Sequence, residues 1–319
     1  MDQTIELHKQ RNFSEKISAS LDFIRLNAKP LFKACLVIAG PVLLVGALIT
    51  GDSYQSMITA MSLIQQDEVA GLDSMSRMGV SIIIGSLVTM LGGLLVVAVV
   101  YQYMRLFEKK QSNDITVGEV WQKVKQNFGS LLATALLYVV LLMVIGFAIA
   151  LTLGLFGSAS PVLTVILLLP AAGFLTYVAI NFSLVLVIES FESRDALSAF
   201  SRSASLIKGN WWSTFALILV TSIIASMVTY MISIITTIVM MAGMLHEGEL
   251  AEPTLFMKII TYITVAITSI IGYLVQVLPL LAMSFQYFNL VELKEARGLM
   301  NKIESFGEAD LTASDEEHY

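Results

Sequence analysis

Long apolar runs separated by shorter polar stretches dominate the chain. A helix needs about 20 consecutive apolar residues to cross the hydrocarbon core of a bilayer. The pattern predicts six such spans, at residues 31–50, 79–104, 130–152, 161–188, 211–243 and 255–289. Because the last two are longer than the core requires, we expect them to tilt or to extend beyond it. The predicted fold class is therefore all-α, a polytopic membrane protein with six transmembrane helices.

The polar stretches before the first, third and fifth spans each contain an amphipathic pattern with helical spacing. Their apolar stripes are Phe13, Ile17, Leu21, Ile24 and Ala28; Val117, Val120, Trp121, Val124 and Phe128; and Leu197, Phe200, Ala204 and Ile207. The chain reads I-R-L-N before the first span, V-K-Q-N before the third and I-K-G-N before the fifth, in each case an apolar residue, a cation, any residue and an asparagine. We interpret these as interfacial helices followed by an elbow at Asn27, Asn127 or Asn210.

The far ends of the units are also similar, since Y-Q-Y-M-R-L-F-E at 101–108 matches F-Q-Y-F-N-L-V-E at 285–292. The chain therefore reads as three repeats, each an amphipathic interfacial helix plus a membrane hairpin. Their approximate bounds are 11–108, 114–192 and 193–295, within a single membrane domain at 1–304. We expect the acidic C-terminal tail, 305–319, to be disordered.

Composition agrees with a membrane protein. Of the 319 residues, 56% are hydrophobic and 14% are charged, whereas soluble domains have roughly 25% charged residues. The first 30 residues are polar and amphipathic, so we expect no cleavable signal peptide. The single cysteine, Cys35, lies in an apolar run and is expected to be a small buried residue.

The positions of the cations predict the orientation. Of the 19 Lys and Arg residues, 17 lie within residues 1–33, 105–125, 194–208 and 294–302, and Arg77 and Lys258 lie in the opposite loops. Loops rich in Lys and Arg remain cytoplasmic, so both termini are predicted to be cytoplasmic. We expect a multi-pass protein of the bacterial inner membrane.

The three tryptophans fall on the predicted cytoplasmic side. Trp121 lies on the second amphipathic helix, and Trp211 and Trp212 follow the elbow of S-L-I-K-G-N-W-W. Indole rings and long cations favour the headgroup layer. We therefore predict that Trp121, Trp211 and Trp212, with Lys125 and Lys208, are interfacial anchors.

Small residues and prolines predict how the spans pack. Ridges of residues four apart lie at 81–93 in the second span, at 221–237 in the fifth and at 264–272 in the sixth, and such ridges allow close helix approach. Pro41, Pro170 and Pro279 are expected to kink their spans. The pattern at 53–65 predicts a separate short helix on the outer surface.

The sequence contains no strong catalytic signal. The spans lack mid-membrane ionisable residues, and His8, His246 and His318 are scattered without metal-ligand spacing. Neutral amides remain, and the four in or near spans are Asn181, Gln102, Gln276 and Gln286. They would either hydrogen-bond between helices or line a polar pathway. We expect no cofactor and no metal.

The stretch E-S-F-E-S-R-D-A-L-S-A-F-S-R-S-A-S-L-I-K-G-N-W-W, residues 189–212, resembles a signature of certain polytopic membrane proteins. These are the YciC-like inner-membrane family and the membrane domain attached to some glycerophosphoryl diester phosphodiesterases. The resemblance implies an integral membrane protein without a defined activity. The phosphodiesterase activity belongs to a separate soluble barrel, so the resemblance implies no catalytic residues here.

Together these features favour a non-enzymatic accessory or scaffold subunit that organises membrane protein partners or lipids. The expected partners are membrane lipids and a membrane protein or a second copy of the chain, with no nucleic acid. The alternative is a transporter or channel for an uncharged or amphiphilic solute. An enzyme would need a cluster of polar groups that the sequence does not indicate.

Overall fold

The computed structural model describes residues 5–63, 68–157, 160–192, 195–247, 255–296 and 300. All regular structure in these ranges is helical. The helices are α1 (Phe13–Ile38), α2 (Gly40–Leu63), α3 (Glu68–Lys110), α4 (Val117–Gly157), α5 (Pro161–Asn181), α6 (Val185–Glu192), α7 (Ala196–Ile207), α8 (Trp211–Glu247), α9 (Leu255–Val275) and α10 (Val277–Glu295).

The helices confirm an all-α, multi-pass membrane fold. Five helical segments are long and apolar enough to cross a membrane, and α1 with the first part of α2 makes a sixth if that bent pair is one span. Helix α3 has 43 residues, which corresponds to a length of about 64 Å. Since the hydrocarbon core is about 30 Å thick, α3 extends well beyond it. The predicted 305–319 tail lies outside the described residues.

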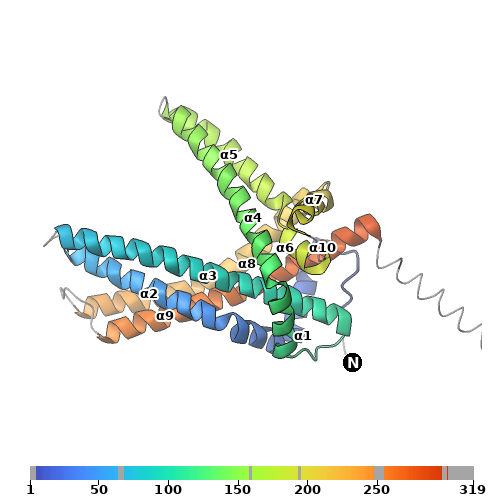
Figure 1. The fold of residues 1–319 in the computed structure, drawn as a ribbon, viewed down its shortest axis with the longest axis horizontal. Coiled ribbons are helices and arrows are strands. Elements are labelled where there is room, and N and C mark those ends of the chain that lie inside the picture. The colour runs from blue at the N-terminus through green and yellow to red at the C-terminus, as the bar shows by residue number, and fades with distance from the viewer. Residues whose placement is uncertain are drawn as a thin grey trace, which may run out of the picture.

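Three regions make up the molecule (Figure 1). Helices α2, α3, α8 and α9 lie side by side as an elongated group, which we call the bundle. Helices α4 and α5 form a separate pair, the hairpin, which diverges from the bundle. Both start from the base, which consists of α1, α6, α7, α10 and the adjoining ends of α3, α4 and α8.

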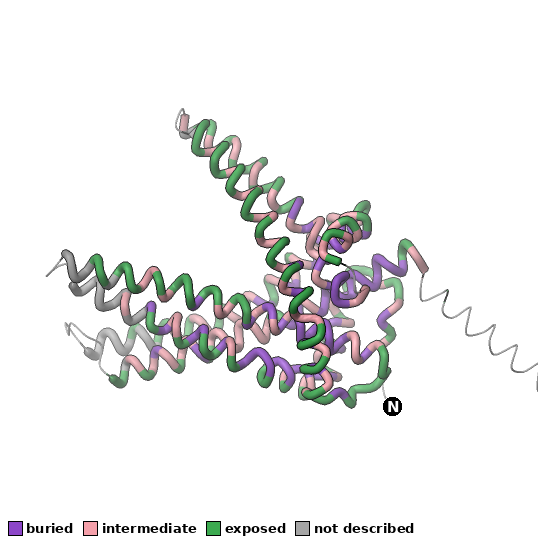
Figure 2. Tube along the Cα trace, in the orientation of Figure 1, coloured by how far each residue is buried: buried purple, intermediate pink, exposed green. Residues whose placement is uncertain are grey.

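The base contains most of the buried residues (Figure 2). Its centre is aromatic, because Phe23 of α1 packs edge-to-face on Phe107 of α3 at 5.0 Å between ring centroids. Phe23 also contacts Tyr103 and Phe285 edge-to-face, at 6.3 Å in each case. Such edge-to-face pairs add stability beyond the burial of their area. Helices α1, α3 and α10 are therefore packed together around the Phe23 side chain.

The described parts of the four cation-rich segments lie in the base. Two contacts join these segments in pairs, His8 with Glu108 at 2.8 Å and Lys294 with the Ser205 carbonyl at 2.6 Å. Two more connect them to adjoining helices, the Arg11 amide with Asn289 of α10 at 2.7 Å and Arg105 with the Ser190 carbonyl of α6 at 2.9 Å. Segments predicted to share one side of the membrane thus assemble at one end of the molecule.

Two of the three span prolines coincide with a break. A proline ring in a helix clashes with the carbonyl four residues earlier and supplies no amide hydrogen. Pro41 follows the break at Ala39, where α1 and α2 meet at an angle of 54°. Pro279 stands four residues after Val275, where α9 ends. Pro170, in contrast, lies inside α5 without ending it.

Of the three predicted elbows, only the one at Asn210 is a break between helices. The predictions at Asn27 and Asn127 were wrong, because α1 and α4 continue through both residues. Each asparagine side chain donates to its own helix, Asn27 to the Phe23 carbonyl at 3.1 Å and Asn127 to the Lys123 carbonyl at 3.0 Å. The Asn210 elbow differs because Gly209 adopts φ +86°, a conformation that favours glycine.

Helix α1 buries a different face from the apolar stripe. Its buried residues include Lys16, Ser20 and Asn27 as well as Phe23. The residues of the predicted stripe, beginning with Phe13, are exposed or half-buried. Polar residues of α1 therefore face the protein beside Phe23, while Phe13 and Leu21 of the apolar row are exposed and Ile24 packs against the edge of the core. In α4, by contrast, Val120 and Val124 of the predicted stripe are buried.

Helix α2 is continuous to Leu63, so the predicted separate surface helix at 53–65 was wrong over the described part of that stretch. Within the bundle, α2 and α3 approach closely through small residues. A methyl group added at Gly46 would lie 2.9 Å from the Thr89 backbone nitrogen, and one at Gly85 would lie 2.8 Å from Thr50 Oγ1. The ridge predicted at 81–93 is thus a tight helix contact.

Candidate functional site

The four amides proposed from the sequence lie in separate surroundings. Gln286 and Gln102 are buried, Asn181 is half-buried, and Gln276 is exposed at the break between α9 and α10. Among the described residues, no hydrogen bond joins any two of these four amides. Gln102 and Gln286 do make contacts between helices, as described below.

Gln286 belongs to a buried network that includes a lysine. Its Oε1 accepts a hydrogen bond from Lys16 Nζ at 2.7 Å, and its Nε2 donates to Thr214 Oγ1 at 2.9 Å. Lys16, with only 3% of its surface exposed, also donates to Ser213 Oγ at 3.2 Å. Within the described residues Lys16 forms no ion pair. Sequence reasoning missed Lys16 because the cation count treated every lysine as solvated.

The break after α5 is held by side chains from three other helices. The last carbonyls of a helix have no partner within it. Here Tyr138 donates to the Ala179 carbonyl at 3.1 Å, Ser203 to the Asn181 carbonyl at 2.7 Å, and Trp211 Nε1 to the Tyr177 carbonyl at 3.3 Å. Asn181 itself donates back to Tyr177. This joint connects the hairpin to the base.

The predicted anchors divide into two kinds. Trp212 is 75% exposed, and Lys208 is exposed. Lys125 lies over the ring of the partly exposed Trp121, with Nζ 5.5 Å from the ring centroid. Trp211 is half-buried and stacks on Phe215 at 5.3 Å. Trp211 is therefore mainly a contact of the joint, whereas the others remain accessible to a membrane surface.

A cluster of charged and polar side chains joins α6, α7 and α10 in the base. Arg202 forms ion pairs with Glu295 and, at 3.1 Å, with Glu192. Tyr287 donates to Glu192 at 2.9 Å. The bond to Glu295 raises the pKa of Arg202, although burial opposes it, and Glu192 adds to the increase. The cluster fixes α7 between its neighbours. No sequence pattern indicated it, since the partners are up to 103 residues apart.

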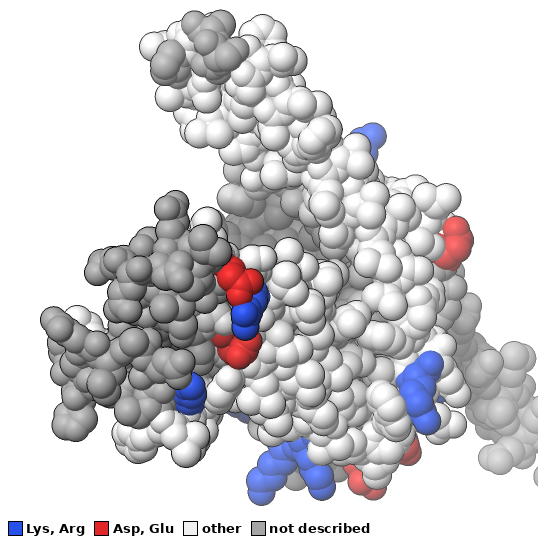
Figure 3. Space-filling model, turned by 60° about the vertical axis from the view of Figure 1, so that its left-hand side comes forward, with Lys and Arg blue, Asp and Glu red and all other residues white. Residues whose placement is uncertain are grey.

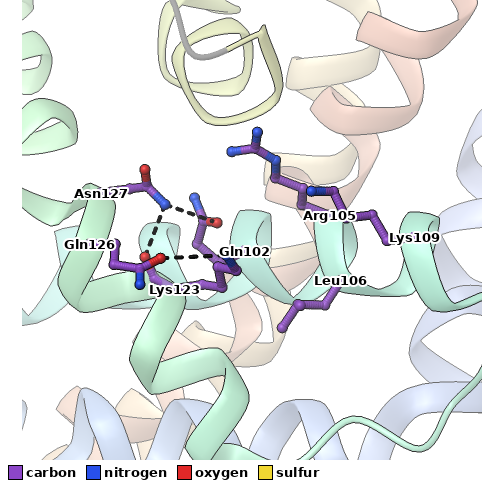
Figure 4. A pocket seen from close by; sticks show the side chains of 7 residues that line it. All are labelled: Gln102, Arg105, Leu106, Lys109, Lys123, Gln126 and Asn127. Atoms are coloured by element: carbon purple, nitrogen blue, oxygen red, sulfur yellow. Dashed lines mark hydrogen bonds between the residues drawn. The ribbon is translucent and has the colours of Figure 1, made fainter.

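A polar hollow of the base lies between the end of α3 and the start of α4 (Figure 4). It has a volume of about 160 Å³ and is lined by Gln102, Arg105, Leu106, Lys109, Lys123, Gln126 and Asn127. We call it the α3–α4 pocket. It thus presents three cations and three amides with no carboxylate in its lining.

The amides of the α3–α4 pocket bridge the two helices. Asn127 Nδ2 donates to Gln102 Oε1 at 3.5 Å, and the two side chains point toward each other in Figure 4. Lys123 Nζ approaches Gln126 Oε1 at 3.4 Å. Arg105 donates to the Ser190 carbonyl and interacts electrostatically with Glu189. The two walls are therefore joined at Gln102 and Asn127, and the lining itself carries three cations.

No group of three or more His, Cys, Asp or Glu residues suited to a metal ion occurs in the part of the chain that the structure describes. The buried Cys35 lies in the core of the base, as expected for a small apolar residue.

Comparison with known proteins gives one match. A family model described as a domain of unknown function, DUF7847, matches residues 37–288. The match begins near the end of α1 and includes all of α2 to α9. No curated protein and no solved structure matches significantly.

Proposed function

The chain belongs to the DUF7847 family, and we propose that it is a non-enzymatic scaffold or accessory subunit that organises membrane proteins or lipids. We place it in the bacterial inner membrane, with the base and both termini cytoplasmic. The assembly of the four cation-rich segments at one end supports this orientation, since cations accumulate on the cytoplasmic side. Its relation to YciC-like proteins stays a prediction.

The main support for this proposal is the exposed apolar surface of the hairpin. Residues 126–188 contain no Lys, Arg, Asp or Glu, and the hairpin surface visible in Figure 3 is uncharged over its spanning length. Phe147 of α4 and Leu169 of α5 are 67% and 75% exposed. None of the most apolar part of Val117–Phe156 is buried inside the protein, and only 11% of the most apolar part of Val162–Glu192 is. The hairpin therefore offers two membrane-embedded helix faces that the rest of the chain leaves uncovered.

Photo-crosslinking tests this role directly. A benzoylphenylalanine placed at Phe147 or Leu169 is expected to give a crosslinked product of defined mass with a membrane protein in native membranes. The matched control is Ile83, which is equally apolar and 61% exposed on α3 of the bundle. Lipid adducts alone, or the same products at Ile83, would refute the assignment of the hairpin as a partner surface.

The alternative, transport of an uncharged or amphiphilic solute, would need a continuous polar path. The positions of the four amides give it less support, because each amide has its own separate surroundings.

A further inference from the structure

We propose that the α3–α4 pocket binds a phosphate group, supplied either by an anionic phospholipid headgroup or by a small soluble phosphoryl anion. The inference goes beyond the scaffold role, because it assigns a ligand to the base and does not depend on what covers the hairpin.

The charge of the pocket favours an anion. Lys109 and Lys123 stand on opposite walls, and neither forms an ion pair with a described carboxylate. Arg105 adds a guanidinium, whose planar set of donors suits phosphate oxygens. Glu189 interacts electrostatically with Arg105, but it is not among the residues that line the pocket. The two ammonium groups are therefore left to be neutralised by an external anion.

The neutral groups of the pocket suit the same ligand. Gln102 is buried, and its Oε1 accepts from Asn127. Its Nε2 donates no hydrogen bond to a described residue, so it remains a donor for an oxygen in the pocket. The volume of about 160 Å³ has room for several water molecules or for one phosphate-sized group.

The position of the pocket favours contact with a membrane surface. Trp121, which is partly exposed, lies on the same helix as Lys123, and Lys125 covers its ring. Tryptophan and lysine at a helix end are typical of the headgroup layer. Basic pockets between membrane helices on the cytoplasmic side are suited to anionic headgroups. The geometry therefore satisfies the requirements of a lipid phosphate and of a soluble one.

The experiment uses the purified full chain in an uncharged detergent at constant ionic strength. Thermal unfolding is followed while short-chain phosphatidylglycerol, short-chain phosphatidylcholine or inorganic phosphate is added. We compare the wild type with the double variant Lys109→Gln/Lys123→Gln. The matched control is Lys29→Gln/Lys33→Gln, which removes the same charge from exposed positions on α1.

We expect one anion to raise Tm in the wild type, with an apparent affinity reduced on the order of tenfold or more in the pocket variant and unchanged in the control. A response to phosphatidylglycerol alone identifies a lipid headgroup, and a response to inorganic phosphate identifies a soluble anion. Both outcomes support the site. Equal responses of the wild type and the pocket variant, or no response to either anion, would overturn the proposal.

Since Lys109 and Lys123 stand at the end of α3 and the start of α4, and Phe147 follows Lys123 by 24 residues of the same helix, the scaffold role would survive that failure. Loss of crosslinks at Phe147 would in turn leave the anion response unaffected. The charge reversal Lys123→Glu provides a second test, because it is expected to abolish the response while leaving Tm without ligand close to that of the wild type.

Discussion

The bundle and the hairpin are both built from long apolar helices, yet one is packed and the other is not. In the bundle, an added methyl group at Gly46, Gly85 or Gly92 would meet atoms of the neighbouring helix within 3.0 Å. In the hairpin, the same addition at Gly146 or Gly173 would meet nothing within 4 Å. Hydropathy alone does not distinguish these two regions.

The comparison shows that small residues favour close helix packing where they face a neighbouring helix of the same chain. Lipid is as apolar as a leucine side chain, so membrane helices associate through close contact and hydrogen bonds. In the described residues, the bundle makes close contacts at several glycines, whereas the hairpin contacts the rest of the chain at the base. The following predictions test this difference, from the largest expected effect to the smallest.

The substitution Gly46→Leu is expected to destabilise the protein by about 3 kcal/mol, at the upper end of overpacking effects. The new side chain would collide with the backbone of Thr89, which cannot move as a flexible side chain can. The free energy of unfolding by SDS in mixed micelles measures the effect. Gly146→Leu, in the hairpin, is the control and is expected to change it little. Equal losses at both positions would contradict the comparison.

The substitution Gln286→Leu removes a buried hydrogen-bond acceptor on α10, in the base. It leaves the Lys16 ammonium with Ser213 as its described hydrogen-bond acceptor, and hydrogen bonds to charged groups contribute about 2 kcal/mol. We expect a loss of that size in the same unfolding assay. Adding Lys16→Met to this variant should restore most of the loss, because it removes the buried charge. If the double variant is less stable than Gln286→Leu, the network explanation is wrong.

Trp211→Phe removes one donor from the joint of the hairpin while retaining an aromatic ring. The Tyr177 carbonyl loses its indole partner, at a cost of about 1 kcal/mol. Hydrogen–deuterium exchange is expected to increase at residues 177–184, with little change in the bundle. The neighbouring Trp212→Phe is the control, since Trp212 is exposed. Faster exchange in both variants would argue against a specific role of the indole N–H.

Phe147→Ala on the hairpin is expected to change the unfolding free energy by less than about 0.5 kcal/mol, as at other exposed positions. Phe23→Ala in the base is the contrasting variant, because Phe23 is fully buried among aromatic rings. A loss at Phe147 comparable to that at Phe23 would show that a partner covers the hairpin in the purified sample.

The sequence predicted the elements of the fold better than their arrangement. The apolar runs predicted the helices, and the Gly-Asn pair predicted the break at residues 209–210, because glycine adopts a positive φ without steric cost. The breaks expected at Asn27 and Asn127 did not occur, since an asparagine without a glycine can hydrogen-bond to its own helix. The divergence of the hairpin depends on which helices find small-residue partners, and a single helix does not reveal that.

The candidate site was predicted only in part. The cation-rich segments indicated which residues would share one end, and this includes Arg105, Lys109 and Lys123. The pocket itself depends on α3 and α4 crossing at Gln102 and Asn127, which no local pattern encodes. Lys16 was missed because its burial depends on Gln286, which lies 270 residues away.

The exposed apolar residues of α1 couple the base to the lateral pressure of the surrounding leaflet. Phe13 and Leu21 stand at the edge of the base, while Asn27 of the same helix accepts a hydrogen bond from Tyr103 of α3 at 2.9 Å. In a bilayer, stretching or thinning of that leaflet would change the free energy of α1. The change would reach the bundle through the contacts of Phe23 and Asn27 with α3 and through the chain itself, which runs from α1 directly into α2.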